Sequence, residues 1–361
     1  MKIPVYSPSI GEEEKHNVLK CLDTGWISSR GEFIELFENK FAEKNSIKYA
    51  ASVCNGTVAL HVALLALGIS EGDEVIVPTL TYIASVNAIK YCNAVPVFTD
   101  SSYDDWQIDP VDIEKKITNK TKAIMVVHLY GHPCDMTRIM EISKKYNIPV
   151  IEDCAEAFGS KHHDKLIGTF GDISTFSFFG NKTITTGEGG MVITNSEDLD
   201  EKVRHIKGQG LAKNRQYWHN IVGYNYRMTN IAAAIGIAQL DKADKFITQK
   251  REIANRYKNA LNKKYLFHTE TSNNFHTYWM CSILIREGGI DERDRLRQFL
   301  DQKGIETRPL FYPVHTMPMY KSPYKFIVAQ DISARGINLP SYPTLSVIEQ
   351  DYIIDTLLSF K

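Results

Sequence analysis

Short apolar runs alternate with helical segments between about residue 50 and residue 195. The runs are rich in Val, Ile and Phe and lack regular alternation with polar residues, which is typical of strands covered on both faces. This order predicts an α/β fold with a mainly parallel central sheet and helices on each side. The predicted strands are Glu74–Pro78, Val95–Asp100, Ala123–Gly131, Pro149–Cys154, Ile173–Phe179 and Gly190–Thr194.

One predicted helix is apolar on nearly every face. It covers Val58 to Leu67, Asn55-Gly56-Thr57 supplies capping residues before it, and Gly68 ends it. A helix without a polar face is buried, so we expect this one in the heart of the domain.

The pattern changes after about residue 230. An Ala-rich helix (231–240) leads into a charged helix (241–261), and a strand (276–285), a charged helix (291–304) and a Pro-rich stretch (308–319) follow. We therefore predict a large domain of residues 1–240 and a smaller α+β domain of residues 241–361.

Charge and cysteine content narrow the classes of protein to which the chain can belong. The 361 residues include 42 basic and 43 acidic side chains, for a formal net charge of −1, whereas a nucleic-acid-binding protein normally has a basic excess. No apolar stretch has the length of a signal peptide or membrane span, and the six cysteines stand singly, without CxxC pairs. We expect a cytoplasmic protein with free thiols, without a metal site, and without contact to nucleic acid or membrane.

Two segments place polar groups where α/β proteins bind ligands. Ser52 to Thr57 opens the buried helix, whose N–H groups favour a phosphate, while Gly56 permits close approach; helix capping alone explains the same residues. Glu152 and Asp153 end an apolar strand, at the sheet edge that binds ligands. An acid there suits a metal ligand, a helix cap or a partner of a cationic cofactor.

Two further segments complete the set. Lys182 leaves an aromatic strand and enters a Gly/Thr-rich turn. Most lysines are solvated, but one flanked by aromatic and small residues can be desolvated, which lowers its pKa and makes the amine a nucleophile. The polar and aromatic segment 223–230 precedes the Ala-rich helix and by itself is an ordinary loop.

In this order, a phosphate cradle, a strand-end carboxylate and a semi-buried lysine are what pyridoxal 5'-phosphate (PLP) requires. The helix start takes the phosphate, the carboxylate keeps the pyridine nitrogen protonated, and the lysine bonds the aldehyde. The rival motifs G-x-G-x-x-G, G-x-x-x-x-G-K-[ST] and G-x-S-x-G are missing from the sequence.

From end to end the sequence resembles the DegT/DnrJ-type sugar-nucleotide aminotransferases of PLP fold type I. Within the family, the similarity is greatest to enzymes that act on a GDP-linked 4-keto-6-deoxy sugar, through segments 178–190, 207–211 and 308–317. The family motifs are Thr24-Gly-Trp-Ile-Ser28, Asn55-Gly-Thr-Val-Ala-Leu-His61, Pro78-Thr-Leu-Thr-Tyr82, Glu152-Asp-Cys-Ala-Glu156, Ser177-Phe-Phe-Gly-Asn-Lys182, Glu188-Gly-Gly190 and Asn225-Tyr-Arg-Met228.

The resemblance implies a role for each matching residue. Lys182 would bond the cofactor and carry the proton between substrate carbon and cofactor, with L-glutamate as amino donor. Asp153 would pair with the pyridinium nitrogen, and Tyr82 would stack on the ring. The phosphate would be bound by Gly56, Thr57 and Ser177, and by Asn225 from the other subunit of a homodimer. Whether two such dimers pair into a tetramer stays open.

Glu156 stands where many relatives have Gln or His, near the cofactor's phenolic oxygen. Either the Glu156 carboxylate and the phenolic oxygen share a proton, because two anions lie so close together, or Glu156 points away from the cofactor. Both interpretations stay open. For the sugar and nucleotide we expect contacts from Trp26, Ser28, Ser29, Arg308, Tyr312 and His315. Alternatively, Arg308, Tyr312 and His315 belong to a loop that only closes the small domain.

Proteins of the same fold have other functions, which the sequence favours to different degrees. An aminotransferase for another nucleotide-linked 4-keto or 3-keto sugar shares the framework. A keto-sugar dehydratase has His in place of the lysine, which Lys182 argues against. A PLP-binding regulator needs a DNA-binding unit for which this length and charge leave no room, and a cysteine desulfurase needs a reactive cysteine on a mobile loop, a setting that none of the six cysteines shows.

Overall fold

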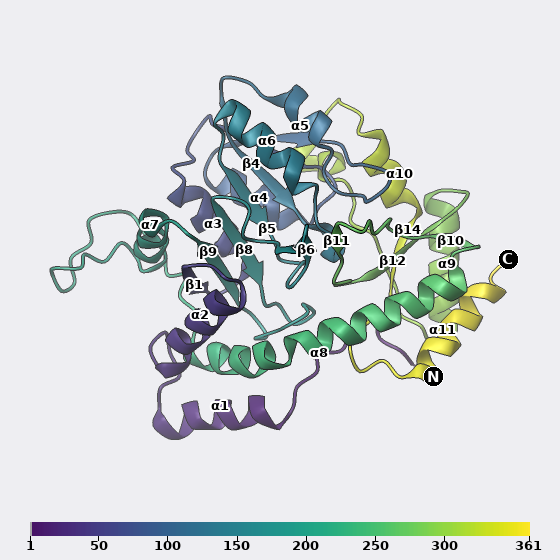
Figure 1. Ribbon diagram of the computed structural model, residues 1–361, viewed down its shortest axis with the longest axis horizontal. Coiled ribbons are helices and arrows are strands. Elements are labelled where there is room, and N and C mark those ends of the chain that lie inside the picture. The colour runs from purple at the N-terminus through teal and green to yellow at the C-terminus, as the bar shows by residue number, and fades with distance from the viewer. Residues whose placement is uncertain (1) are drawn as a thin grey trace.

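A seven-stranded sheet forms the centre of the molecule (Figure 1), and the computed structural model describes residues 2–361. Strand β9 runs antiparallel to both of its neighbours, and the other six strands run in one direction, as the sequence predicted. In spatial order the strands are β1 (Tyr49–Val53), β9 (Gly190–Thr194), β8 (Ile173–Ser177), β5 (Val150–Asp153), β4 (Thr121–Val127), β2 (Glu74–Pro78) and β3 (Val95–Thr99).

Helices cover both faces of this sheet, which explains why its strands lack polar alternation. In β4, Ala123 and Met125 pack into one core cluster, whereas Ile124 and Val126 pack into the other. The helices of the first cluster are α3 (Gly56–Ala66), α4 (Ile83–Tyr91) and α7 (Glu197–Lys207). Those of the second are α2 (Glu32–Lys44), α5 (Pro110–Lys116), α6 (Met136–Tyr146) and the first part of α8 (Asn230–Leu261), and α1 (Glu12–Thr24) lies against α8.

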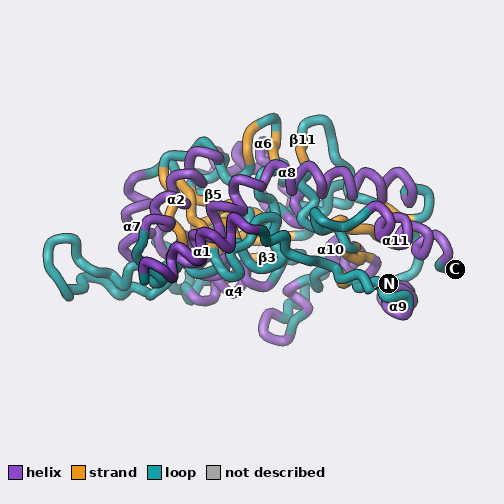
Figure 2. Tube along the Cα trace, turned by 90° about the horizontal axis from the view of Figure 1, so that it is seen from below, coloured by secondary structure: helices purple, strands orange, loops and turns teal. Residues whose placement is uncertain are grey.

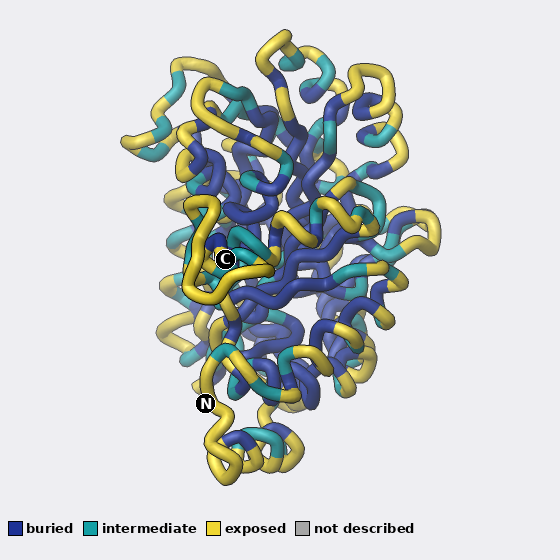
Figure 3. Tube along the Cα trace, turned by 90° about the vertical axis from the view of Figure 1, so that its left-hand side faces the viewer, coloured by how far each residue is buried: buried dark blue, intermediate teal, exposed yellow. Residues whose placement is uncertain are grey.

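The buried helix predicted from the sequence is α3. Asn55 caps it, since its side chain accepts a hydrogen bond from the N–H of Val58 at 3.0 Å. The helix therefore begins at Gly56, two residues earlier than predicted, and its apolar side chains pack in a core cluster. Figure 3, coloured by burial, shows that the buried parts of the chain gather in the interior of the molecule. This places the capping loop at the carboxyl edge of the sheet.

A second, antiparallel sheet belongs to the C-terminal part of the chain. Its order is β10 (Tyr265–Leu266), β12 (Cys281–Ile285), β14 (Gly336–Leu339) and β13 (Arg308–Pro309), with helices α9 (Ile290–Gln302), α10 (Ile327–Arg335) and α11 (Val347–Ser359). A small third sheet joins β11 (Asn274–Phe275) to β6 (Lys161–His162) and β7 (Lys165–Leu166), and short 3-10 turns lie at Leu129–Gly131, Val314–Thr316 and Pro318–Tyr320.

Most predicted element ends shift by no more than two residues, and three differences are larger. The strand expected over residues 276–285 begins only at Cys281, because Tyr278 has a left-handed backbone (φ 51°). The strand expected over 123–131 ends at Val127, before a turn in which Tyr130 has φ 57°. The two helices expected over 231–261 form one helix, α8.

The chain passes from the first sheet to the second along α8 rather than through a linker. The predicted boundary at residue 240 lies inside this helix. Near the other end of the chain, Ile3 pairs with Ile305 and packs into the core cluster of the second sheet. The division into domains at residue 240 stays a prediction.

The loop between α7 and α8 projects from the body of the molecule, as the views from two directions show (Figures 1 and 2). Its most exposed apolar side chains are Tyr217 (93% exposed) and Val222 (88% exposed). Across residues 2–361, no helix combines the length and the apolar character needed to cross a membrane.

An aromatic cluster supports the sheet directly beneath β8. Phe41 of α2 is fully buried, with its ring centre 5.0 Å from that of Phe176 and 5.6 Å from that of Phe178. Because side chains alternate along a strand, these two rings point into the core while Ser177 between them points to the opposite face. The cluster thus fixes the strand that carries Ser177.

We expect Phe41→Ala to lower the free energy of unfolding by about 3–5 kcal/mol, because the lost ring leaves a cavity that its neighbours fill only in part. Equilibrium urea unfolding measures this. The control is Ile348→Ala on α11, whose side chain is 71% exposed and whose loss should cost under about 1 kcal/mol. Equal losses for the two variants would contradict this account of the core.

Candidate active site

A cavity of about 560 Å³ opens at the carboxyl edge of the central sheet, where the second sheet meets it. This volume is in the range of small-molecule sites. The start of α3, the ends of β5 and β8, and the segment around Lys182 form its inner wall. From the second sheet and its loops, Trp279, Arg308, Phe311 and Asn338 form the opposite wall.

The start of α3 and the end of β8 form a narrow cradle at one side of the cavity. The first-turn N–H groups of Gly56 and Thr57 have no acceptor within the helix. A Cβ atom on residue 56 would lie 2.7 Å from Cβ and 2.9 Å from Oγ of Ser177. The missing side chain therefore leaves the N–H groups and the Ser177 hydroxyl open to one small anion.

Asp153 ends β5 and faces the same cavity. Its Oδ2 accepts a hydrogen bond from the Ser85 hydroxyl at 2.8 Å, and its Oδ1 accepts one from the N–H of Ala155 at 3.1 Å. Burial raises the pKa of this carboxyl group. Within residues 2–361 it forms no ion pair, so a cationic ligand would lower its pKa and stabilise its charge.

Lys182 lies in the loop after β8, and its side chain is only 13% exposed. Its Nζ atom lies 3.7 Å from Oε1 of Glu156 and 3.7 Å from the ring centre of Trp279. Burial lowers the pKa of this amine. The backbone is fixed as well, since the Tyr6 hydroxyl donates a hydrogen bond to the Lys182 carbonyl at 2.6 Å.

Glu156 faces the cavity rather than away from it. Its Oε2 accepts a hydrogen bond from the N–H of Tyr130 at 2.8 Å, and burial raises the pKa of the carboxyl group to about 7. Of the two open interpretations, this position favours the one in which Glu156 shares a proton at the site.

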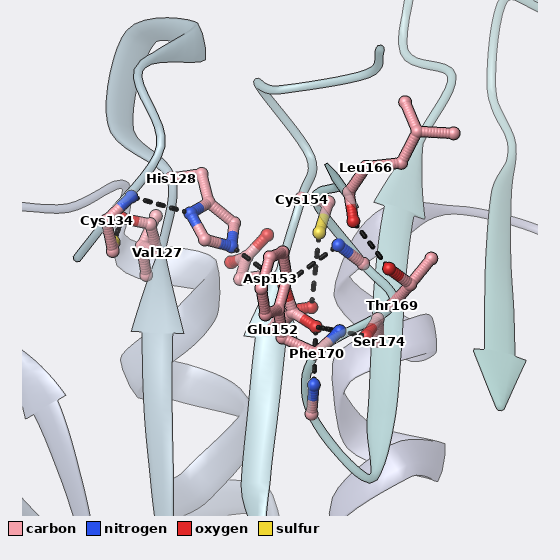
Figure 4. Close-up of polar contacts among 12 residues, drawn as sticks. Val127, His128, Cys134, Glu152, Asp153, Cys154, Leu166, Thr169, Phe170 and Ser174 are labelled. Atoms are coloured by element: carbon pink, nitrogen blue, oxygen red, sulfur yellow. Dashed lines mark hydrogen bonds and ion pairs between the residues drawn. The ribbon is translucent and has the colours of Figure 1, made fainter. Parts of the chain in front are cut away.

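Behind the cavity, His128, Glu152 and Cys154 bring three potential metal ligands together (Figure 4). His128 accepts a hydrogen bond from the Cys134 N–H through Nδ1 and contacts Glu152 through Nε2 at 3.2 Å. The Glu152 carboxylate also accepts hydrogen bonds from the N–H groups of Gly168, Phe170 and Gly171 and from the Ser174 hydroxyl. With their lone pairs engaged in this way, these groups hold the end of β5 next to Asp153.

Proteins of similar sequence identify the family of this chain. Residues 8–358 match the model of the DegT/DnrJ/EryC1/StrS aminotransferase family. The chain belongs to this family. Among curated relatives, GDP-perosamine synthase of Escherichia coli O157:H7 is 64% identical over 359 residues (99% of this chain, 98% of the relative), and the protein of that name from Vibrio cholerae is 50% identical over 347 residues (95% of each).

Solved structures of family members have the same fold. The putative sugar aminotransferase Spr1654 of Streptococcus pneumoniae in its PMP form matches with a TM-score of 0.94 at 28% identity, over 99% of this chain and 97% of that one. Helicobacter pylori PseC, an aminotransferase of pseudoaminic acid biosynthesis, matches with a TM-score of 0.93 at 26% identity, over 99% and 98%. The chain is therefore a PLP-dependent aminotransferase of fold type I.

The residues of this aminotransferase fit PLP. The free N–H groups at the start of α3 and the Ser177 hydroxyl suit a phosphate, and the buried Asp153, which forms no ion pair among residues 2–361, suits a pyridinium nitrogen. Lys182 has the lowered pKa that an amine needs to attack an aldehyde near neutral pH. Tyr82 lines the same cavity, and its ring packs 5.5 Å from that of Phe311.

Other expected site residues lie outside the cavity of one subunit. Asn225 is exposed in the segment between α7 and α8, where its side chain accepts a hydrogen bond from Nε of Arg227. The buried His315 contacts the Thr79 hydroxyl at 2.6 Å and lines no part of the cavity. The structure likewise does not bring these residues to the cavity: Trp26, Ser28, Ser29 and Tyr312. Of the expected sugar and nucleotide contacts, only Arg308 lines it.

Two residues of the site gave no signal in the sequence. Ser85 hydrogen bonds to Asp153 across 68 positions of the chain, and Trp279 faces Lys182 across 97 positions. Neither residue stands in a motif or next to another polar candidate. Only the packing of α4 and of the second sheet against the cavity reveals them.

We expect Gly56→Ala to weaken PLP binding roughly tenfold or more, because overpacking of a close contact costs about 1–3 kcal/mol. The measurement is the dissociation constant of PLP for the apoprotein. Gly289→Ala is the control, since a Cβ there meets no atom within 4 Å. Unchanged PLP affinity in Gly56→Ala would rule out the cradle as the phosphate site.

Replacing Glu156 tests the charge next to the lysine. In the apoprotein the Glu156 carboxylate favours the protonated amine, so Glu156→Gln should lower the pKa of Lys182 further. Since only the neutral amine attacks an aldehyde, the rate of PLP uptake, plotted against pH, should rise at lower pH in this variant. Glu188→Gln, a change elsewhere on the cavity wall, should leave the curve in place. A shift to higher pH in Glu156→Gln would contradict the proposed coupling.

Proposed function

We propose that the enzyme transfers the amino group of L-glutamate to C4 of GDP-4-keto-6-deoxy-D-mannose, giving GDP-perosamine and 2-oxoglutarate, a step of O-antigen sugar biosynthesis. Transamination is supported by the largely buried amine of Lys182, which faces Asp153 and Glu156 in one cavity. The choice of sugar is supported by identities of 64% and 50% to GDP-perosamine synthases over nearly the whole chain.

PLP, when bound, supplies an aldehyde that takes up the amino group and a ring that withdraws electrons from the substrate carbon. The protein's part is to hold this ring and to move protons. Asp153 keeps the ring nitrogen protonated, and Ser85 and Ala155 keep that carboxylate in place. Gly56, Thr57 and Ser177 bind the phosphate, and Tyr82 covers one face of the ring.

Lys182 is the acid and base of both half-reactions. Its amine removes the proton from the α carbon of glutamate and later delivers a proton to C4 of the sugar. The lowered pKa leaves a larger neutral fraction at physiological pH than an exposed lysine has. Such proton transfer typically contributes ~10²–10⁴-fold in rate. Trp279 and Glu156 keep Nζ close to its working position.

Both substrates are anions, and Arg308 is suited to bind them. Apart from Lys182, it is the one cationic side chain from residues 2–361 that lines the cavity. Its guanidinium is about half exposed, and the nearest carboxylate, that of Glu306, lies 3.7 Å away. We assign it to the glutamate carboxylate or the diphosphate of the nucleotide sugar.

The active site is proposed to be completed in a homodimer. Asn225 is exposed at the base of the segment between α7 and α8, where it pairs with Gly208 and does not line its own cavity, and this segment exposes the apolar Tyr217 and Val222. Exposed apolar groups on one segment favour contact with another protein surface. A second copy of the chain would bring Asn225 to the phosphate and cover this surface; the roles expected for Trp26, Ser28 and Ser29 also belong to this proposal.

The assay of function compares GDP-, dTDP- and UDP-linked 4-keto-6-deoxy sugars with L-glutamate as donor. We expect the GDP sugar to be preferred roughly tenfold or more in kcat/KM, with amino sugar and 2-oxoglutarate formed in equal amounts. Lys182→Ala should lose at least about 10²–10⁴-fold in turnover. A preference for another nucleotide would overturn the choice of sugar, and a lack of 2-oxoglutarate would overturn transamination.

A further inference from the structure

Tyr130 lies where the two sheets meet, in the turn after β4, and is fully buried. Its backbone has the left-handed conformation (φ 57°, ψ 12°), which residues with a side chain rarely adopt. This conformation directs its N–H toward Oε2 of Glu156 while its ring extends toward the second sheet. One residue thus contacts both walls of the cavity.

The ring of Tyr130 touches two parts of the outer wall. It stacks on Trp279, with ring centres 6.2 Å apart and an angle of 11° between the planes, and Trp279 in turn faces Nζ of Lys182. The Tyr130 hydroxyl accepts a hydrogen bond from the N–H of Phe311 at 2.9 Å.

The segment Arg308–Phe311 leaves the second sheet at the point where its backbone meets the Tyr130 hydroxyl. Residues 308 and 309 pair with β14, and Leu310 donates to Gly336, but the strand pairing ends there. The N–H of Phe311 then turns to the Tyr130 hydroxyl. Because Arg308 and Phe311 both line the cavity, this hydrogen bond fixes the end of the wall that faces the substrates.

We propose that Tyr130 is a positioning residue, whose hydroxyl sets the Arg308–Phe311 segment over the cavity and thereby sets the affinity for the anionic substrates. This inference rests on the proposed function through the role of Arg308. The hydroxyl touches neither the cofactor site nor the reacting carbon, so it affects KM and leaves the chemical step alone.

The test uses Tyr130→Phe, Arg308→Ala and the double variant of the PLP-loaded enzyme. In Tyr130→Phe we expect KM for glutamate, for the GDP sugar, or for both to rise about threefold to tenfold, with kcat within about twofold, as for loss of one neutral hydrogen bond. In the Arg308→Ala background, Tyr130→Phe should change KM by less than about twofold, since the two act as a unit.

Tyr257→Phe is the matched control. Tyr257 is equally buried, and its hydroxyl donates a single hydrogen bond, to the Pro340 carbonyl at 2.9 Å, in the core of the second sheet. Its loss should lower the melting temperature and leave both KM values unchanged. Unchanged KM values in Tyr130→Phe, or a full additional rise in the Arg308→Ala background, would overturn the proposal.

Hydrogen exchange supplies a readout that needs no turnover. In the wild-type protein the amide of Phe311 should exchange slowly, and in Tyr130→Phe it should exchange several-fold faster, while amides of β14 keep their protection. Fast exchange at Phe311 in the wild-type protein would overturn the proposal even if the variant did not fold. If the wild-type protein made no amino sugar, the proposed function would fail. The exchange rate at Phe311 would still show whether its N–H is bound to the Tyr130 hydroxyl.

Discussion

The partial burial of one amine beside two buried carboxyl groups is the constraint on which the structure depends. Lys182 becomes a nucleophile only when it is withdrawn from water, yet a withdrawn charge is costly unless partners surround it. The fold meets both conditions, because Asp153 ends β5, Glu156 follows in the next turn, and Trp279 covers the amine. Asp153 accepts hydrogen bonds from Ser85 and Ala155, and Glu156 accepts one from the N–H of Tyr130.

These partners come from both sheets, so the site exists only where the sheets are held together. The first sheet contributes the lysine, the acids and the phosphate cradle. The second contributes Trp279, Arg308 and Phe311. The long helix α8 and the turn at Tyr130 connect the two parts, and Ile3 fixes the N-terminal segment to the second sheet. The geometry of the active site therefore depends on the contacts between the two sheets.

The sequence predicted the features that depend on residues close together in the chain. The strands β2 and β9 have the predicted bounds, and α3 is buried as its apolar sequence indicated, because such patterns follow directly from backbone periodicity. The contacts of Ser85, Trp279 and Tyr130 were not predictable, since they join residues far apart in the chain and depend on how the sheets pack. The sequence also failed to show that residues 231–261 are one helix, since charge and alanine content change within it.

The central claim is that Lys182 forms the covalent bond to PLP. Borohydride reduction of the PLP-loaded protein, followed by proteolysis and mass spectrometry, tests it directly, because the reduction makes the bond permanent. We expect the cofactor on the peptide that contains Lys182 and on no other. Label on Lys207 or Lys250, which are also buried, or no label at all, would contradict the account.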